Sequence, residues 1–267
     1  MKKNHKVVVA HPDDEIIFFS SVLKSSSKII ICFNESEDKI VNEGREKIKN
    51  QLPYTRPSFL NLKEANVFNS ADWSFPKSDQ KGLLIKKNKL NYKKNFSKLK
   101  LHLSKLMNIG DTIYTHNPWG EYGHEEHVQV FKAIYDLKKK FKLKIYFNGY
   151  VSNKSYNLML KQKNLISNIK QKKIIDKKFT EKIKNIYLLN NCWTFDEFYI
   201  WPKIEIFYQI KDPDKRSNYK LNYDHLSTLN IMPGNYKINF LKKFLEMIIS
   251  YKLKKKIKKF INSLTNI

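Results

Sequence analysis

The sequence predicts an α/β protein with a Rossmann-like, doubly wound and mostly parallel sheet flanked by helices. Short runs of β-branched residues alternate with segments of helical periodicity through about residue 150, which is the pattern of β-α-β units. The 267 residues are 41% hydrophobic and 13% aromatic, as expected of a chain that buries a core. No apolar run approaches the ~18 residues that would suggest a membrane-spanning helix.

Strands are expected where short apolar runs rich in β-branched residues occur. These runs lie at residues 6–10, 28–33, 112–115 and 144–147, with a further short strand at 66–68. Helices are expected where apolar residues recur at spacings of three and four. These segments lie at residues 15–23, 43–52, 90–107 and 125–141.

The second half of the chain has a less regular pattern. Residues 155–190 are Lys-rich and predicted to be helical, and residues 199–208 form an aromatic segment that Pro202 confines to an edge strand or breaks. Residues 211–236 are expected to be loop, and residues 238–264 a long basic amphipathic helix. We therefore expect one domain over residues 1–210 and a helical extension over 211–267 that packs on it. The alternative is that this last helix lies on an anionic membrane.

The formal net charge of +26 suggests a polyanionic partner, but the type of basic residue argues against one. Only three of the 51 basic residues are arginines, the residue usually chosen for bidentate contacts to phosphates and bases. Lys, Asn and Ile are all plentiful and have AT-rich codons, so we attribute much of the charge to genome composition. We expect no nucleic-acid partner and a cytoplasmic location, with the inner face of the membrane as the alternative.

The segment His11-Pro12-Asp13-Asp14-Glu15 follows the first predicted strand and opens a helix. Open parallel sheets bind ligands at that edge. One interpretation is structural: the aspartates stabilise the helix N-terminus and the histidine packs. The other is a zinc site, because an imidazole and a carboxylate are zinc ligands and a second carboxylate remains free as a base. Glu15 has no assigned role beyond the helix start.

A second polar segment, residues 115–127, follows the strand predicted at 112–115 and leads into the next helix. His124 and His127 are three residues apart, so both can face one way at a helix start. Such a pair alone is weak evidence, but two clusters on one sheet edge could close a single site. His116 is expected either to support that site or to pack at the strand end.

The motif AHPDDE, followed about a hundred residues later by GHxxH, resembles the PIG-L/LmbE-like family of zinc-dependent de-N-acetylases. The resemblance covers roughly residues 5–150. It implies one zinc ion per chain, held by His11, Asp14 and His127, and it makes Asp13 the general base. Three protein ligands leave a fourth zinc position for water, whose pKa the metal lowers to about 7.

The resemblance also suggests how the substrate is held. His124 would steady the oxyanion or assist proton transfer, and Tyr122 would reach the substrate carbonyl. Arg45 lies near the family's substrate-contacting arginine, although the local spacing differs, and an ordinary surface arginine is the alternative. Trp119 could wall the pocket, because aromatic faces suit sugar rings, or could pack within its loop.

Two departures from the family pattern concern Glu126, where an aspartate is more usual, and residues 33–38, which lack a glycine-rich Thr-x-Gly loop. The second leaves substrate recognition open. We expect hydrolysis of the N-acetyl group of an amino sugar, such as a GlcNAc-like unit of a glycan, glycolipid or sugar nucleotide. The alternatives are an amidase acting on a thiol conjugate or other small amide, and a basic membrane- or nucleic-acid-binding protein with an inactive metal site.

Overall fold

The computed structural model describes residues 5–54, 57–211 and 230–231. The loop predicted at 211–236 lies almost wholly outside these residues, and the helix predicted at 238–264 lies entirely outside them. The C-terminal extension and its contact with a membrane therefore stay predictions. Within the described ranges, no helix combines the length and the apolar character that crossing a membrane requires.

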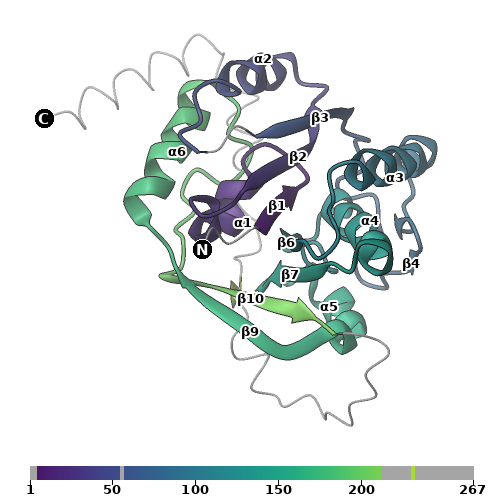
Figure 1. Cartoon of the computed structure of the whole chain (residues 1–267). Helices are drawn as coiled ribbons and strands as arrows, with labels where there is room; N and C mark the ends of the chain where they lie inside the picture. Colours follow the sequence, from purple (N-terminus) through teal and green to yellow (C-terminus); the bar gives the residue numbers. More distant parts are fainter. Residues whose placement is uncertain (1–4, 55–56, 212–229, 232–267) are drawn as a thin grey trace, which may run out of the picture. The chain divides into compact units, whose positions relative to one another are not determined.

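A seven-stranded mixed sheet forms the centre of the described chain (Figure 1). Its order is β3-β2-β1-β6-β7-β10-β9, in which the first five strands are parallel and β10 is antiparallel to both neighbours. The strands are β1 (His5–Val9), β2 (Lys28–Glu35), β3 (Ser58–Lys63), β6 (Thr112–Thr115), β7 (Lys144–Asn148), β9 (Ile166–Ile174) and β10 (Ile204–Ile210). This arrangement confirms the predicted doubly wound, mostly parallel α/β fold.

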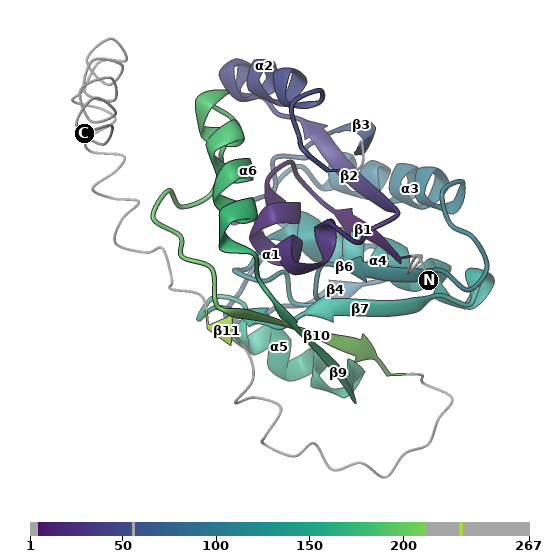
Figure 2. The same cartoon turned by 60° about the vertical axis from the view of Figure 1, so that its left-hand side comes forward.

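Helices cover both faces of this sheet, with α1 and α6 on one side and α3 and α4 on the other (Figure 2). The six α-helices of the described ranges are α1 (Asp14–Leu23), α2 (Lys39–Ile48), α3 (Lys89–Ser104), α4 (Glu125–Phe141), α5 (Tyr156–Gln162) and α6 (Lys177–Leu189), and a short 3-10 helix, η1 (Lys163–Leu165), follows α5. Two small strand pairs, β4 (Ser78–Asp79) with β5 (Gly82–Leu83) and β8 (Tyr150–Val151) with β11 (Asn230–Ile231), complete the regular structure.

The apolar run of β1 divides between two hydrophobic cores, because successive side chains of a strand point to opposite faces. Val7 and Val9 join the core beneath α1 and α6, whereas Val8 and Ala10 join the core beneath α3 and α4. A strand buried on both faces needs a continuous apolar run, which explains why this segment does not alternate with polar residues.

The structure corrects the prediction for the second half of the domain. Residues 155–190 are not one helical region, because β9 lies between α5 and α6. This strand is at the edge of the sheet and is mostly exposed, so its lysines suit an edge that must resist further pairing. Strand β10 starts after Pro202 and lies inside the sheet, so the proline does not confine it to an edge. The strand predicted at 66–68 is also wrong, since β3 occupies 58–63.

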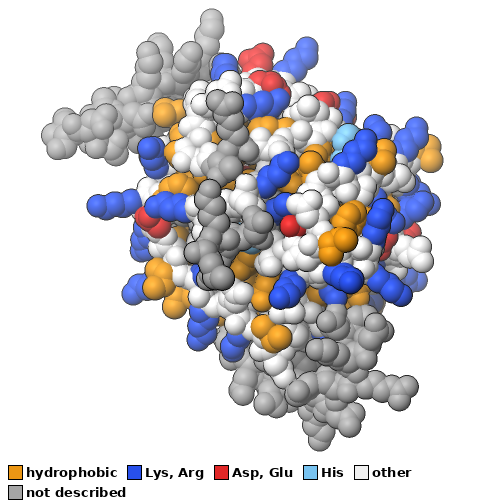
Figure 3. Space-filling model, in the orientation of Figure 1, with side chains coloured by type: hydrophobic (Ala, Val, Ile, Leu, Met, Phe, Trp, Pro, Cys, Tyr) orange, Lys and Arg blue, Asp and Glu red, His pale blue; other side chains and the backbone are white. Residues whose placement is uncertain are grey.

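Lys and Arg side chains are scattered over the face shown in Figure 3, with hydrophobic and neutral groups between them. On that face the positive charge does not gather into one stripe of the kind that follows a nucleic-acid backbone. The absence of a nucleic-acid partner stays a prediction.

Candidate metal and catalytic centre

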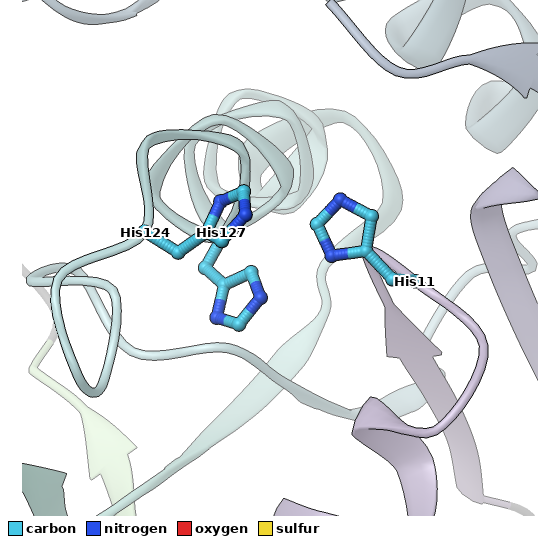
Figure 4. Close-up of side chains that lie close together, drawn as sticks. All are labelled: His11, His124 and His127. Atoms are coloured by element: carbon cyan, nitrogen blue, oxygen red, sulfur yellow. The ribbon is translucent and has the colours of Figure 1, made fainter. Parts of the chain in front are cut away.

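The two polar motifs follow β1 and β6, which pair directly as parallel neighbours. The order of strands reverses between them, because β1 leads to β2 and β3 on one side and β6 leads to β7 on the other. Ligands of open α/β sheets bind at such a reversal, outside the carboxyl ends of the strands. In Figure 4, His11 from the segment after β1 faces His124 and His127 at the start of α4. The structure therefore brings the two motifs together.

The Asp14 carboxylate is at the centre of the buried cluster. Its Oδ2 atom lies 3.2 Å from His11 Nδ1, 3.3 Å from His127 Nε2 and 3.4 Å from His116 Nε2. Burial alone would raise the pKa of Asp14, but the histidines, led by His127, hold it well below its ordinary value. Asp14 is therefore a buried carboxylate that stays ionised and offers an oxygen ligand.

His127 presents a buried nitrogen toward the Asp14 carboxylate. Its Nδ1 lies 2.8 Å from Glu121 Oε2, whereas its Nε2 is buried without a hydrogen-bond partner among the described residues. With the proton on Nδ1, Nε2 presents a lone pair toward Asp14. Zinc ligands at about 2.0–2.1 Å in a tetrahedron stand roughly 3.4 Å from one another, close to the 3.3 Å observed between these two atoms. These two atoms could therefore hold a metal ion between them.

His11 also contacts a second carboxylate, that of Glu126. Its Nε2 lies 2.9 Å from Glu126 Oε2, and the other Glu126 oxygen accepts the Ala65 N–H at 2.6 Å. Burial would lower the pKa of His11, but Asp14 and Glu126 together raise it well above its ordinary value. This position thus stabilises positive charge. Carboxylates that orient ligating histidines are typical of metal sites. Glu126 was not among the ligands expected from the sequence, but its contact with His11 makes it part of the centre.

The predicted ligands are distributed over two overlapping groups. In the described part of the chain, two sets of three side chains have candidate ligand atoms within 4.8 Å of one another: His11, His124 and His127, and Asp14, His116 and His127. His127 belongs to both sets. His116 Nε2 already accepts the Ala10 N–H at 2.8 Å, and its Nδ1 lies 3.2 Å from Glu121. His116 therefore supports the site and does more than pack at the strand end.

Asp13 is buried next to Asp14. It precedes α1, but its side chain makes no capping hydrogen bond, so the structural interpretation of this residue is wrong. Its Oδ2 instead accepts from the backbone N–H of Thr194 at 2.7 Å and from the Thr194 hydroxyl at 2.8 Å. Burial, with a contribution from Asp14, raises the pKa of Asp13 to about 8. A cation bound nearby would lower this pKa toward the range in which a general base works best.

His124 and Tyr122 are half-buried at the edge of the cluster and can donate hydrogen bonds. His124 Nδ1 accepts the Glu126 N–H at 3.2 Å, which places its proton on Nε2. Burial, with His127 and His11 nearby, holds the pKa of His124 well below its ordinary value, so the ring is neutral. Burial and the Asp14 charge keep the pKa of the Tyr122 phenol well above its ordinary value. Both side chains are therefore neutral donors beside the centre.

Arg45 and Trp119, the two residues predicted to contact the substrate, are both buried in the structure. Arg45 in α2 is buried at 2% exposure and donates from Nη1 to Glu64 at 2.5 Å, so it is no surface arginine. It acts electrostatically on Asp13, and its contact with substrate stays a prediction. Trp119 is fully buried, and its indole N–H donates to the Tyr150 carbonyl at 2.6 Å. The prediction that Trp119 walls the pocket is wrong, because an enclosed ring cannot face a sugar.

Comparison with known proteins matches residues 6–138 to the family model PIG-L, described as GlcNAc-PI de-N-acetylase. The chain belongs to the PIG-L family. Membership identifies a de-N-acetylase-type hydrolase and accounts for the paired motifs around Asp14.

The relatives found include an uncharacterized protein of Acanthamoeba polyphaga mimivirus. It is 27% identical over 197 residues, which cover 71% of this chain and 82% of that protein. A solved structure described as a deacetylase–teicoplanin complex from the biosynthesis pathway of teicoplanin is also similar. It covers 77% of this chain and 97% of its own, at 6% identity and a TM-score of 0.45. That likeness is too distant to add to the argument.

Proposed function

We propose that this PIG-L protein removes the N-acetyl group from an acetylated amino sugar with one zinc ion held by His11, Asp14 and His127. The observation that carries the proposal is the buried Nε2 of His127, which has no hydrogen-bond partner among the described residues and faces the ionised Asp14 carboxylate at 3.3 Å. A buried nitrogen without a partner costs ~1–3 kcal/mol, and a bound metal ion would remove that cost.

The surrounding side chains have the chemistry that amide hydrolysis requires. When bound, zinc makes water a nucleophile at neutral pH and polarises the amide carbonyl. Asp13 takes one proton from the attacking water, whose oxygen forms a bond to the acetyl carbon. His124 and Tyr122 donate hydrogen bonds to the carbonyl oxygen as it gains negative charge. The C–N bond then breaks, and the proton on Asp13 passes to the leaving amine, which yields acetate and a free amino sugar.

The sugar substrate is inferred from the family and not from any residue of the site. Acetate release should be measured across N-acetylated amino sugars, sugar nucleotides and lipid-linked sugars, together with zinc content. We expect release from at least one of them by protein carrying one zinc per chain. Release only from an acetylated thiol conjugate would favour the amidase alternative. No release and substoichiometric zinc would favour a binding protein with an inactive site.

Two variants separate the proposed roles. Asp13→Ala should keep zinc and lose turnover, because it removes the base and leaves the ligands in place. His127→Ala should lose zinc, because it removes the nitrogen that both sets of candidate ligands share. Zinc bound by the His127 variant with wild-type affinity would overturn the ligand assignment.

A further inference from the structure

The backbone of Asp13 adopts a conformation that has to be held in place. Its φ is 93°, on the left-handed side that side chains other than glycine rarely adopt. Such a conformation costs of order 1–3 kcal/mol and persists only where neighbouring groups enforce it. The Asp13 N–H donates to Glu15 Oε2 at 3.0 Å, and the other Glu15 oxygen accepts from the hydroxyls of Tyr54 at 2.7 Å and Tyr187 at 2.6 Å. Glu15 thereby ties the Asp13 backbone to α6.

The Asp13 carboxylate is held from the same side of the molecule. Both donors of Thr194, its N–H and its hydroxyl, bind one oxygen, Oδ2. Neither of them engages Oδ1. Two donors on a single oxygen fix the rotation of the carboxylate, and they leave Oδ1 as the oxygen that can accept a proton from water.

The turn that carries Thr194 is itself firmly attached. The N–H of Cys192 donates to the Tyr187 carbonyl at 3.1 Å, which folds the chain back over the end of α6. Helix α2 packs closely on the same turn, since a Cβ added at Gly44 would lie 2.1 Å from the Asn190 carbonyl oxygen. Thr194 therefore has a rigid support from which to position another group.

We propose that Thr194 is a positioning residue for the catalytic base, and that it presents Oδ1 of Asp13 to the attacking water. This inference rests on the proposed function. Thr194 and Tyr187 both lie beyond residues 6–138, so α6 and the stretch after it complete an active site whose ligands lie within the family match. A purely structural role, in which the hydroxyl only satisfies a buried carboxylate, would leave turnover unchanged once the protein folds.

Three full-length variants test the proposal. Thr194→Val removes the hydroxyl and keeps the shape, Thr194→Ser restores the hydroxyl, and Thr180→Val makes the same replacement in α6 as a control. Thr180 is buried, whereas Thr194 is exposed, and the Thr180 hydroxyl donates to the Lys177 carbonyl within α6. We expect Thr194→Val to lower kcat about 10- to 100-fold at unchanged KM and zinc content, because a small misplacement of a reacting group has effects of that size. Thr194→Ser and Thr180→Val should stay within about threefold of wild type.

Crystal structures of the wild-type and Thr194→Val proteins provide a measurement that does not depend on turnover. We expect the Asp13 carboxylate to rotate away from its wild-type position in Thr194→Val, with His11, Asp14 and His127 unmoved. An unchanged carboxylate, wild-type kcat in Thr194→Val, or failure of Thr194→Ser to restore kcat would each overturn the inference. A wild-type protein that releases no acetate from any substrate would refute the proposed function, and the rotation of Asp13 would still decide whether Thr194 holds it.

Discussion

The replacement Glu121→Gln tests how the carboxylate behind the histidines prepares the site for a metal. One Glu121 oxygen, Oε2, lies 2.8 Å from His127 Nδ1 and 3.2 Å from His116 Nδ1. The other accepts from the Asn117 N–H at 2.9 Å and from Asn148 Nδ2 at 2.5 Å. Burial would raise the pKa of Glu121, but His116 and His127 outweigh it and hold that pKa at about 2. All four neighbouring groups therefore face an ionised acceptor.

A glutamine at this position has only one acceptor oxygen. The Asn117 N–H is fixed by the backbone, so the amide oxygen stays on that side and the NH2 group turns toward the imidazoles. To accept from it, His127 must move its proton to Nε2, which removes the lone pair that would bind zinc. Loss of such an orienting carboxylate typically weakens metal binding 10- to 100-fold, or about 1.4–2.7 kcal/mol.

Zinc affinity should be measured by competition with a chromophoric chelator, with Glu125→Gln as the matched control. Glu125 is also buried, but one oxygen accepts from Ser70, Ala71 and Trp73 while the other has no partner in the described structure, so an amide there keeps the three donors satisfied and moves no imidazole proton. We expect only Glu121→Gln to weaken binding. Wild-type affinity in Glu121→Gln, or an equal loss in Glu125→Gln, would refute the reasoning.

Two further predictions concern buried groups outside the ligand set. Trp119→Phe should lower the free energy of unfolding by about 2 kcal/mol, because the Tyr150 carbonyl loses one of its two donors and the smaller ring leaves a cavity in the core. The same variant should leave KM unchanged, and a raised KM in a fully stable variant would restore Trp119 to the substrate site. Burial raises the pKa of Glu205 to about 7, although hydrogen bonds from Ser21 and Ser20 act to lower it. A raised carboxyl pKa means that the folded state favours the protonated form of Glu205, so protonation of this residue stabilises the fold. The stabilisation is complete below the ordinary pKa of 4.5 and is lost as pH rises through about 7. When unfolding is measured by chemical denaturation from pH 5 to 8, the free energy of unfolding of wild type should fall by up to roughly 3 kcal/mol, and Glu205→Gln should not show this fall. Equal pH profiles of the two proteins would contradict this prediction.

The sequence was sufficient to predict the parts of the molecule that depend on local pattern. The apolar run of β1 and the amphipathic α4 were both predicted within a residue or so of their observed bounds. The motifs at their ends then fell on one sheet edge because adjacent parallel strands share that edge. Strand β9 escaped prediction because its exposed edge position leaves it too few apolar residues to show a two-residue period.

The supporting residues of the site could not be predicted, because their roles depend on contacts between distant segments. Glu121 gives no signal in its neighbourhood, and its function is visible only when it meets Asn148 and two imidazoles. Thr194 is an ordinary loop threonine 181 residues from the aspartate that it binds. Trp119 was expected either to wall the pocket, because aromatic faces suit sugar rings, or to pack within its loop, and only side-chain burial decides between the two.

Reconstitution with zinc tests the central claim most directly. Metal should be removed from the full chain with a chelator, zinc should be added back in steps, and acetate release and bound zinc should be measured on the same samples. The assignment of His11, Asp14 and His127 predicts that release rises in proportion to bound zinc and reaches its plateau at one ion per chain, while Asp13→Ala takes up the same ion without release. Full turnover by protein that holds almost no metal would contradict it.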